Sequence, residues 1–276
     1  MKILKAISII LIFSFLTILT QVGGIVYLIS RTTYNKITSL TTNKYKLSLY
    51  KFASFLLIYA FSTFLLVPII AKPFGRVPLP LTEKNHLQPL NVFTFILNRN
   101  YVRKELEESV IDVANKMNEI YPGTTINYLD ANFPFINNFP LLPHLSHNDG
   151  RKLDLSYCYK DSKTGKSTNE CPSFIGYGIS EEPKKEEINT ECICSEKGYW
   201  AYSLLSKIVS KKNKLNYNFD EDKTKNLVNL FVANKAIGKI FIEPHLKTRL
   251  NLFSNKVKFH GCKSVRHDDH IHVQLK

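Results

Sequence analysis

Two long apolar runs open the chain. Residues 6–29 contain no charged side chain, and residues 52–71 contain none either. Each run is about long enough to cross a hydrocarbon core of ~30 Å as a helix. We therefore expect a two-helix transmembrane hairpin over residues 1–71. A cleaved signal peptide is the alternative for the first run, but the apolar part of such a peptide is usually only about 7–15 residues long.

Beyond residue 92 the pattern changes to short segments with alternating apolar and polar positions. Apolar residues recur at helical spacing in three segments, 102–120, 199–209 and 222–236. Alternation with a period of two predicts strands over 124–129, 152–159, 239–242, 257–260 and 270–275. The pattern therefore predicts an α+β domain over residues 92–276, in which helices flank a small antiparallel sheet.

Two further segments interrupt this pattern. Residues 72–91 begin with three prolines in eight residues, which is typical of an extended linker. Residues 160–197 are polar, charged and rich in Cys, around a short strand-like stretch at 174–177. We interpret the first as a Pro-rich linker and the second as a loop-rich insertion in the domain.

The net charge of +14 is unevenly distributed. Residues 1–71 carry seven of the 37 Lys and Arg and none of the 23 Asp and Glu, and five of the seven lie between residues 31 and 51. Because basic loops are retained in the cytoplasm, we expect loop 31–51 to be cytoplasmic, and both chain ends and the domain to face the periplasm or cell exterior.

The remaining 30 basic and 23 acidic residues leave the domain with a net charge of +7. This charge suits an anionic polymer such as a cell wall, or an anionic lipid surface. The chain contains no recognisable nucleic-acid-binding motif, so we expect no nucleic-acid partner.

All five cysteines lie in the predicted domain. In an oxidising compartment they predict one or two disulfides, whose pairing the sequence leaves open. Their spacing lacks the paired clusters of a structural zinc site. They are Cys158, Cys171, Cys192, Cys194 and Cys262.

Two blocks rich in histidine carry the candidate chemistry. The first reads His144-x-x-His147-x-x-Gly150-x-x-x-Asp154, and the second reads His267-x-x-His270-x-His272. Residues at i and i+2 of a strand face the same way, so the last two histidines share one side. Two imidazole nitrogens and one carboxylate oxygen, with a fourth position for water, are typical of a catalytic zinc site. The alternative is a solvent-facing tail that binds metal opportunistically.

The two blocks resemble those of the penicillin-insensitive murein endopeptidases. This family belongs to the wider fold group of lysostaphin-type, D-Ala-D-Ala-type and sonic-hedgehog-type zinc proteins. The resemblance covers roughly residues 100–276. It implies one Zn²⁺ held by His147, Asp154 and His272, with His267 and His270 as catalytic residues and His144 lining the site. Lys152 departs from the pattern, because an acidic residue is expected at this point in the family.

Three more residues are candidates for substrate contact or for support of the ligands. His245 follows Glu243-Pro244 at the end of a predicted strand, where it could contact substrate. Asp268 and Asp269 could orient ligand imidazoles, which usually donate their second N–H to a carboxylate or carbonyl. A structural role for His245 and solvated turns for the two aspartates are the alternatives.

The resemblance implies a membrane-anchored zinc metallopeptidase that hydrolyses peptide cross-links in peptidoglycan. Alternatives are a zinc carboxypeptidase or protease with another peptide substrate, and a zinc-containing binding domain without catalysis. The presence of His267 and His270 beside three ligands favours an enzyme, since a binding module needs no group for proton transfer.

Overall fold

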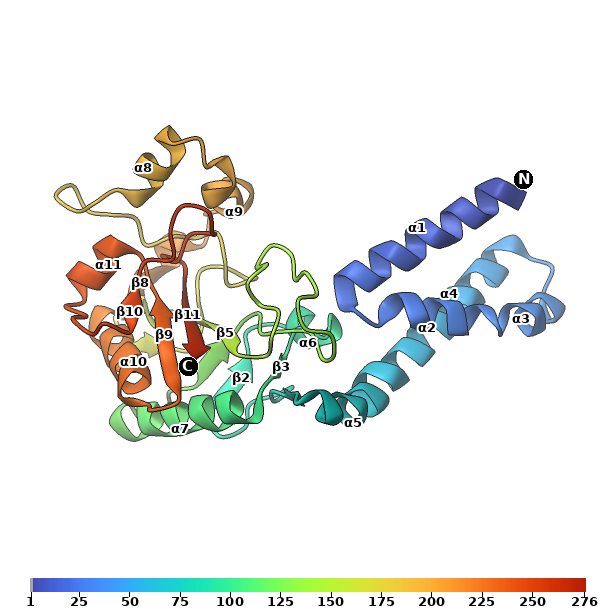
Figure 1. Ribbon diagram of the computed structural model, residues 1–276, viewed down its shortest axis with the longest axis horizontal. Coiled ribbons are helices and arrows are strands. Elements are labelled where there is room, and N and C mark those ends of the chain that lie inside the picture. Colours follow the sequence, from blue (N-terminus) through green and yellow to red (C-terminus); the bar gives the residue numbers. More distant parts are fainter. Residues whose placement is uncertain (1) are drawn as a thin grey trace.

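The structure is a computed structural model and describes residues 2–276. Helices over residues 2–74 form an apolar region that extends away from the rest of the chain, as Figure 1 shows. The rest folds as a mixed α and β domain around a central sheet. The expected α+β character is therefore confirmed at this level.

The first apolar run forms two helices instead of one. Helix α1 spans Lys2–Thr20 and α2 spans Gly23–Arg31, while Gln21 between them has a left-handed φ of 64°. The chain reverses at this residue, so the prediction of one helix over 6–29 is wrong. As a result, the N-terminus lies at the same end of the region as α3 (Tyr34–Leu40), far from the domain (Figure 1).

The second apolar run is helical from Lys44 to Phe74. It consists of α4 (Lys44–Phe61), a π-helical turn η1 (Ser62–Leu66), α5 (Val67–Ala71) and a final 3₁₀ turn η2 (Lys72–Phe74). Pro68 has no N–H for the ladder, which accounts for the widened turn before it. Both this helix and α1 are long and apolar enough to span a membrane.

The central sheet has the strand order β10-β9-β11-β5-β4-β2. Its inner pairs β9–β11, β11–β5 and β5–β4 are antiparallel, as predicted, but the outer pairs β10–β9 and β2–β4 are parallel. The bounds are β10 (Val257–Lys258), β9 (Ile237–Phe241), β11 (His270–Leu275), β5 (Lys152–Ser156), β4 (Ile126–Tyr128) and β2 (Leu87–Pro89).

The two faces of the sheet have different roles. Helices α7 (Lys104–Ile120) and α10 (Glu221–Ala233) cover one face, and their apolar side chains share a core with Leu153 and Leu155 of β5 and with Ile271 and Val273 of β11. Because side chains alternate along a strand, the intervening residues of β5 and β11 point to the opposite face.

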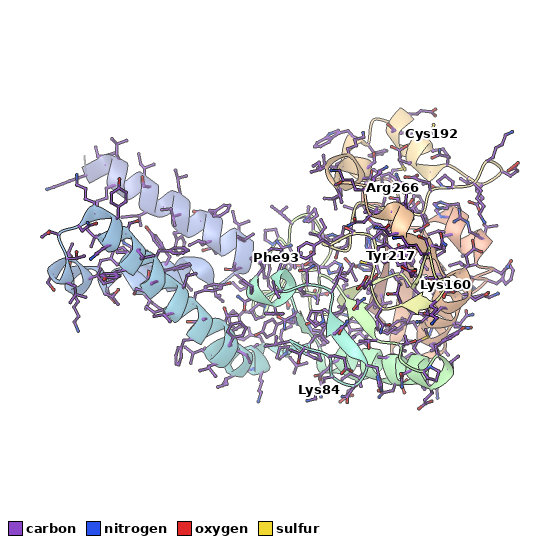
Figure 2. The ribbon with its side chains drawn as sticks, turned by 180° about the vertical axis from the view of Figure 1, so that it is seen from behind. Lys84, Phe93, Lys160, Cys192, Tyr217 and Arg266 are labelled. Atoms are coloured by element: carbon purple, nitrogen blue, oxygen red, sulfur yellow. A yellow bond between two sulfur atoms is a disulfide. The ribbon has the colours of Figure 1, made fainter. Side chains whose placement is uncertain are left out.

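The segment expected to be a linker is part of the domain. Strand β1 (Val77–Pro78) pairs with β3 (Tyr101–Val102), and both Leu79 and Leu87 lie in the core. The short helix α6 (Phe93–Ile96) meets the helical region, where Tyr59 donates to the carbonyl of Ile96 at 2.6 Å. Figure 2 labels Phe93 at this junction. The domain therefore begins well before residue 92.

The expected insertion is mostly loop but contains regular elements. Strands β6 (Tyr159–Asp161), β7 (Ser167–Thr168) and β8 (Tyr217–Phe219) form a small second sheet. The insertion also contains the short helix α8 (Thr190–Glu196). The short elements that lie beyond the insertion are η3 (Trp200–Ser203), α9 (Leu204–Ile208), η4 (Lys214–Asn216) and α11 (Pro244–Arg249). Residues 174–177 form a turn, so the strand predicted there is wrong.

One disulfide, Cys194–Cys262, joins α8 to the loop that precedes the second histidine block. Cys158 is buried, Cys171 is half-buried and Cys192 is exposed, and these three are free thiols among the described residues.

Candidate metal centre

Strand pairing brings the two histidine blocks together. On the sheet face opposite α7 and α10, His272 of β11 lies directly across from Asp154 of β5. His147 reaches the same point from the loop before β5, in a turn closed by its own N–H bonded to the carbonyl of His144 at 2.9 Å. The predicted ligands are therefore neighbours, and each is fully or almost fully buried.

One oxygen of Asp154 meets two imidazoles. Oδ1 lies 2.9 Å from Nδ1 of His272 and 3.2 Å from Nε2 of His147, and these two nitrogens lie 3.0 Å apart. Ligands at about 2.05 Å from a tetrahedral zinc ion lie about 3.3 Å from one another. The three donor atoms are thus spaced much like the ligands of one metal ion.

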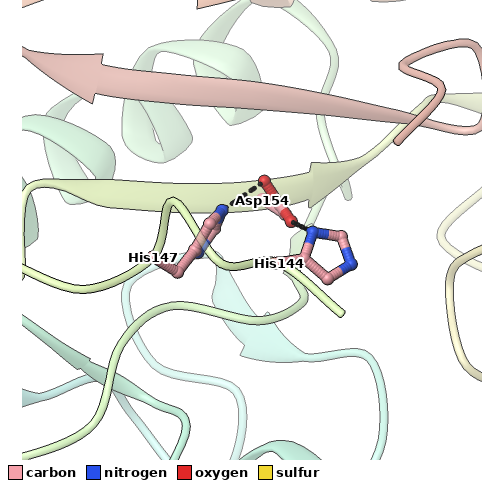
Figure 3. A group of neighbouring side chains, drawn as sticks. All are labelled: His144, His147 and Asp154. Carbon is pink, nitrogen blue, oxygen red and sulfur yellow. Dashed lines mark ion pairs between the residues drawn. The ribbon is translucent and has the colours of Figure 1, made fainter. Parts of the chain in front are cut away.

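The other oxygen of Asp154 meets a third imidazole. His144 Nδ1 lies 3.0 Å from Oδ2, and His144, His147 and Asp154 form a buried group that could hold a metal ion (Figure 3). His270 Nε2 lies 3.7 Å from the same oxygen. The sequence placed His144 only at the edge of the site, whereas the structure gives it a position among the possible ligands.

The ring orientations are set by neighbouring acceptors. Nδ1 of His147 donates to the carbonyl of Ala131 at 2.6 Å, which leaves Nε2 facing Asp154. Nδ1 of His270 lies 2.5 Å from Asp269, as predicted for a supporting carboxylate. Such hydrogen bonds fix the tautomer and orientation of imidazoles around a metal.

His267 is held through its backbone. Its N–H donates to Glu243 at 3.1 Å, and its carbonyl accepts from the hydroxyl of Tyr157 at 2.9 Å. Its ring lies 4.9 Å from that of His270, measured between centroids. Both predicted catalytic histidines therefore adjoin the cluster.

Burial and neighbouring charges set the protonation states of two of the proposed ligands. Burial opposes the charge of Asp154, but the imidazoles of His147, His270 and His144 hold its pKa well below the usual value. Burial lowers the pKa of His272 to about 3. The carboxylate is therefore ionised and His272 is neutral, which are the states that metal ligands require.

The two predicted catalytic histidines differ in charge. Burial, reinforced by His270 and His272, lowers the pKa of His267 well below its usual value. Burial acts in the same direction on His270, but Asp154 and Asp269 outweigh it and raise its pKa to about 9. At neutral pH this arrangement places a neutral imidazole next to a protonated one.

Several nitrogens of the cluster lack a partner. Among residues 2–276, Nε2 of His144, Nε2 of His270, Nε2 of His272 and Nδ1 of His267 are buried without a hydrogen bond. Buried polar groups are almost always satisfied, so such a concentration at one point indicates a site made for a ligand. None of the four is a donor atom of the His147, Asp154 and His272 set, so they indicate polar space beside the possible metal position. The donor set and its spacing are what fit a bound metal.

Tyr177, in the insertion, is a site residue that sequence reasoning missed. Its hydroxyl donates to Oδ2 of Asp154 at 2.9 Å and accepts from the N–H of Asp130 at 3.1 Å. The signal in the sequence was its position between Gly176 and Gly178, both of which have positive φ. A tight turn with glycine on either side lets the tyrosine ring enter the site.

Three residues that the sequence associated with the site do not join the cluster. His245 is buried in α11, where Nε2 lies 2.8 Å from the carbonyl of Glu181. Asp268 forms an ion pair with Arg266 at 2.5 Å, and the imidazole near it is that of His245, with Nε2 4.0 Å from Oδ2. Lys152 forms an ion pair with Asp149 at 2.8 Å.

The loop that carries the first histidine block is also supported by the segment that was expected to be a linker. The buried guanidinium of Arg76 lies against Gly150, where a Cβ would approach it to 2.5 Å. Arg76 also donates to Asn137 at 2.6 Å. The first histidine block therefore packs on a residue that precedes the domain predicted from the sequence.

A cavity of about 310 Å³ adjoins the cluster. His144, His267 and His272 line it, together with apolar residues of the 143–145 and 201–205 segments. A volume near 300 Å³ is at the lower end for small-ligand sites. The buried cluster therefore has space beside it for part of a substrate.

No model of a known protein family matches the chain, and no curated protein matches it in sequence. The resemblance to the murein endopeptidases depends on the two histidine blocks alone.

Proposed function

We propose that this protein is a membrane-anchored zinc metallopeptidase that hydrolyses peptide cross-links in peptidoglycan. The observation that carries the proposal is the convergence of His147, Asp154 and His272, whose donor atoms lie within 3.2 Å of one another beside His267 and His270. Two nitrogens and one carboxylate oxygen suit zinc better than calcium or magnesium, which prefer oxygen ligands.

The proposed chemistry divides between the ion and the surrounding histidines. A bound zinc ion would polarise the peptide carbonyl and make water a stronger nucleophile. His270, held by Asp269, stabilises the negative charge that develops on the carbonyl oxygen. His267, which has no carboxylate partner among residues 2–276, accepts a proton and passes it to the leaving amine.

The helical region supports a membrane anchor. Helix α1 and the helix over Lys44–Phe74 are the candidate spans. In the fold, the start of α1, a helix whose first four residues include two lysines, lies at the same end as α3, opposite the domain (Figure 1). Under the positive-inside rule we place this end in the cytoplasm and the domain outside, where the disulfide would persist. This reverses the location that the sequence predicted for the N-terminal end, which was expected outside, because the chain turns back at Gln21.

Digestion of purified peptidoglycan by the zinc-loaded full chain tests the proposal. Mass analysis of the soluble products should show cross-linked peptides converted to their uncrosslinked halves, and His272→Ala should release none. Removal of single terminal residues would instead indicate a carboxypeptidase. Intact wall material together with retained zinc would favour a binding domain without catalysis.

A further inference from the structure

The lining of the 310 Å³ cavity is partly apolar and partly polar. The 143–145 and 201–205 segments contribute apolar side chains, and Ser146, His260 and Lys263 also line the cavity. Among residues 2–276, no Asp or Glu lines this cavity. A mixed apolar and cationic lining suits a small residue that carries a negative charge.

The loop that carries Lys263 is fixed over the cavity at both ends. Its neighbour Cys262 is bonded to Cys194 of α8, and the N–H of Arg266 donates to the carbonyl of Tyr202 at 3.3 Å. Figure 2 shows Arg266 below the lobe that carries Cys192. The backbone that carries Lys263 is thus fixed before binding, so less conformational entropy is lost when a ligand arrives.

Three histidines that line the cavity also favour a polar ligand. His144, His267 and His272 each line it, and each has a buried ring nitrogen without a partner among residues 2–276. His260, which also lines the cavity, packs edge-on against Phe241 at 4.4 Å between ring centroids. The cavity is thus lined by polar as well as apolar side chains.

We propose that this cavity binds a carboxylate group of the substrate next to the bond that is cleaved, with Lys263 as its charged partner. The inference rests on the proposed function and narrows its substrate class to peptides with a carboxylate within about one residue of the scissile bond. A chain terminus and an acidic side chain offer the same chemistry, and the test below distinguishes them.

Binding of small fragments tests the cavity without any hydrolysis. The probes are N-acetylalanine, with a terminal carboxylate, its uncharged amide, and the α-amide of N-acetylglutamate, with a side-chain carboxylate. Dissociation constants are measured by ligand-observed NMR on the zinc-loaded full chain in detergent. We expect at least one acid to bind about tenfold more tightly than the amide, because a charge-assisted hydrogen bond is gained.

Variants at Lys263 assign the preference to this residue. Lys263→Met should remove most of the roughly tenfold preference, and Lys263→Arg should restore it. The matched control is Lys258→Met, which removes an exposed positive charge from β10 without touching the cavity. The preference should also weaken as ionic strength rises, since exposed charges are screened.

Clear results would overturn the proposal. Equal binding of both acids and the amide would contradict a carboxylate site beside Lys263. A preference for an acid over the amide that persists in Lys263→Met would contradict it too. Digestion of peptidoglycan by the wild-type chain tests the proposed function independently of these binding measurements. A protein that cleaves cross-links yet shows no preference for acids would keep its function and lose this substrate assignment.

Discussion

The substitution Tyr177→Phe tests whether the insertion supports the metal centre. The wild-type hydroxyl is buried and makes two hydrogen bonds, to Oδ2 of Asp154 at 2.9 Å and from the N–H of Asp130 at 3.1 Å. Phenylalanine keeps the ring but removes both. Leaving a buried polar group without its partner costs about 1–3 kcal/mol.

The loss should divide into a metal-dependent part and a structural part. Loss of a hydrogen bond to a ligating carboxylate typically weakens metal binding by about 10–100-fold, which equals about 1.4–2.8 kcal/mol. The N–H of Asp130 loses its acceptor whether or not metal is bound. Zinc-free Tyr177→Phe should therefore already unfold at a lower temperature than the zinc-free wild type, and zinc should widen the difference.

Competition with a chromogenic chelator gives the zinc dissociation constant, and thermal unfolding with and without chelator separates the two parts. Tyr217→Phe is the matched control, because its hydroxyl donates to Glu170 at the surface, at 2.7 Å. A zinc dissociation constant within twofold of wild type in Tyr177→Phe would refute a supporting role for this hydroxyl.

Three further predictions concern the ligands, acid stability and topology. His272→Ala should lose both zinc and activity, whereas His270→Ala should keep zinc, as measured by elemental analysis, and lose about 10²–10⁴-fold in turnover; equal turnover in His270→Ala would exclude proton transfer or charge stabilisation by this residue. The hydrogen bond from Arg249 lowers the pKa of Glu187 to about 2, below its usual 4.5, so its stabilising contribution is complete above about pH 4.5 and is lost as the pH falls towards 2. Glu187→Gln should therefore flatten the fall in melting temperature over that range, and an unchanged pH profile would contradict it. A cysteine placed near the N-terminus and one placed in the 31–51 segment should react with the same reagents in intact cells, and labelling from opposite sides would contradict the reversal at Gln21.

The alternation of apolar and polar residues was enough to predict which face of each strand carries the candidate ligands. In β5 and β11 apolar residues alternate with Asp154, His270 and His272, and the structure buries the apolar set against α7 and α10. A shift of one residue in register would turn the apolar side chains of the strand to the opposite face of the sheet. Burial of the apolar face therefore also determines which side chains meet on the other face. The period of the pattern was therefore enough to place these residues on one side of the sheet.

Three features were decided only by contacts between distant parts of the chain. Gln21 reverses an apolar run that has helical composition throughout, and its side chain accepts from the N–H of Phe135, 114 residues away. Arg76, in a Pro-rich stretch typical of a linker, is buried against Gly150. Tyr177, in a polar insertion, completes the surroundings of Asp154.

None of these contacts has a local periodicity. Helical and strand patterns arise because neighbouring residues share one environment, and they report which face of an element is buried. A turn or loop residue is placed by the partner that it meets after the chain has closed, and that partner can lie anywhere in the sequence. Periodicity thus predicted the strands of the central sheet and the faces on which Asp154 and His272 lie. The ligand set of His147, Asp154 and His272 came from the family resemblance, and contacts between distant segments determine what surrounds it.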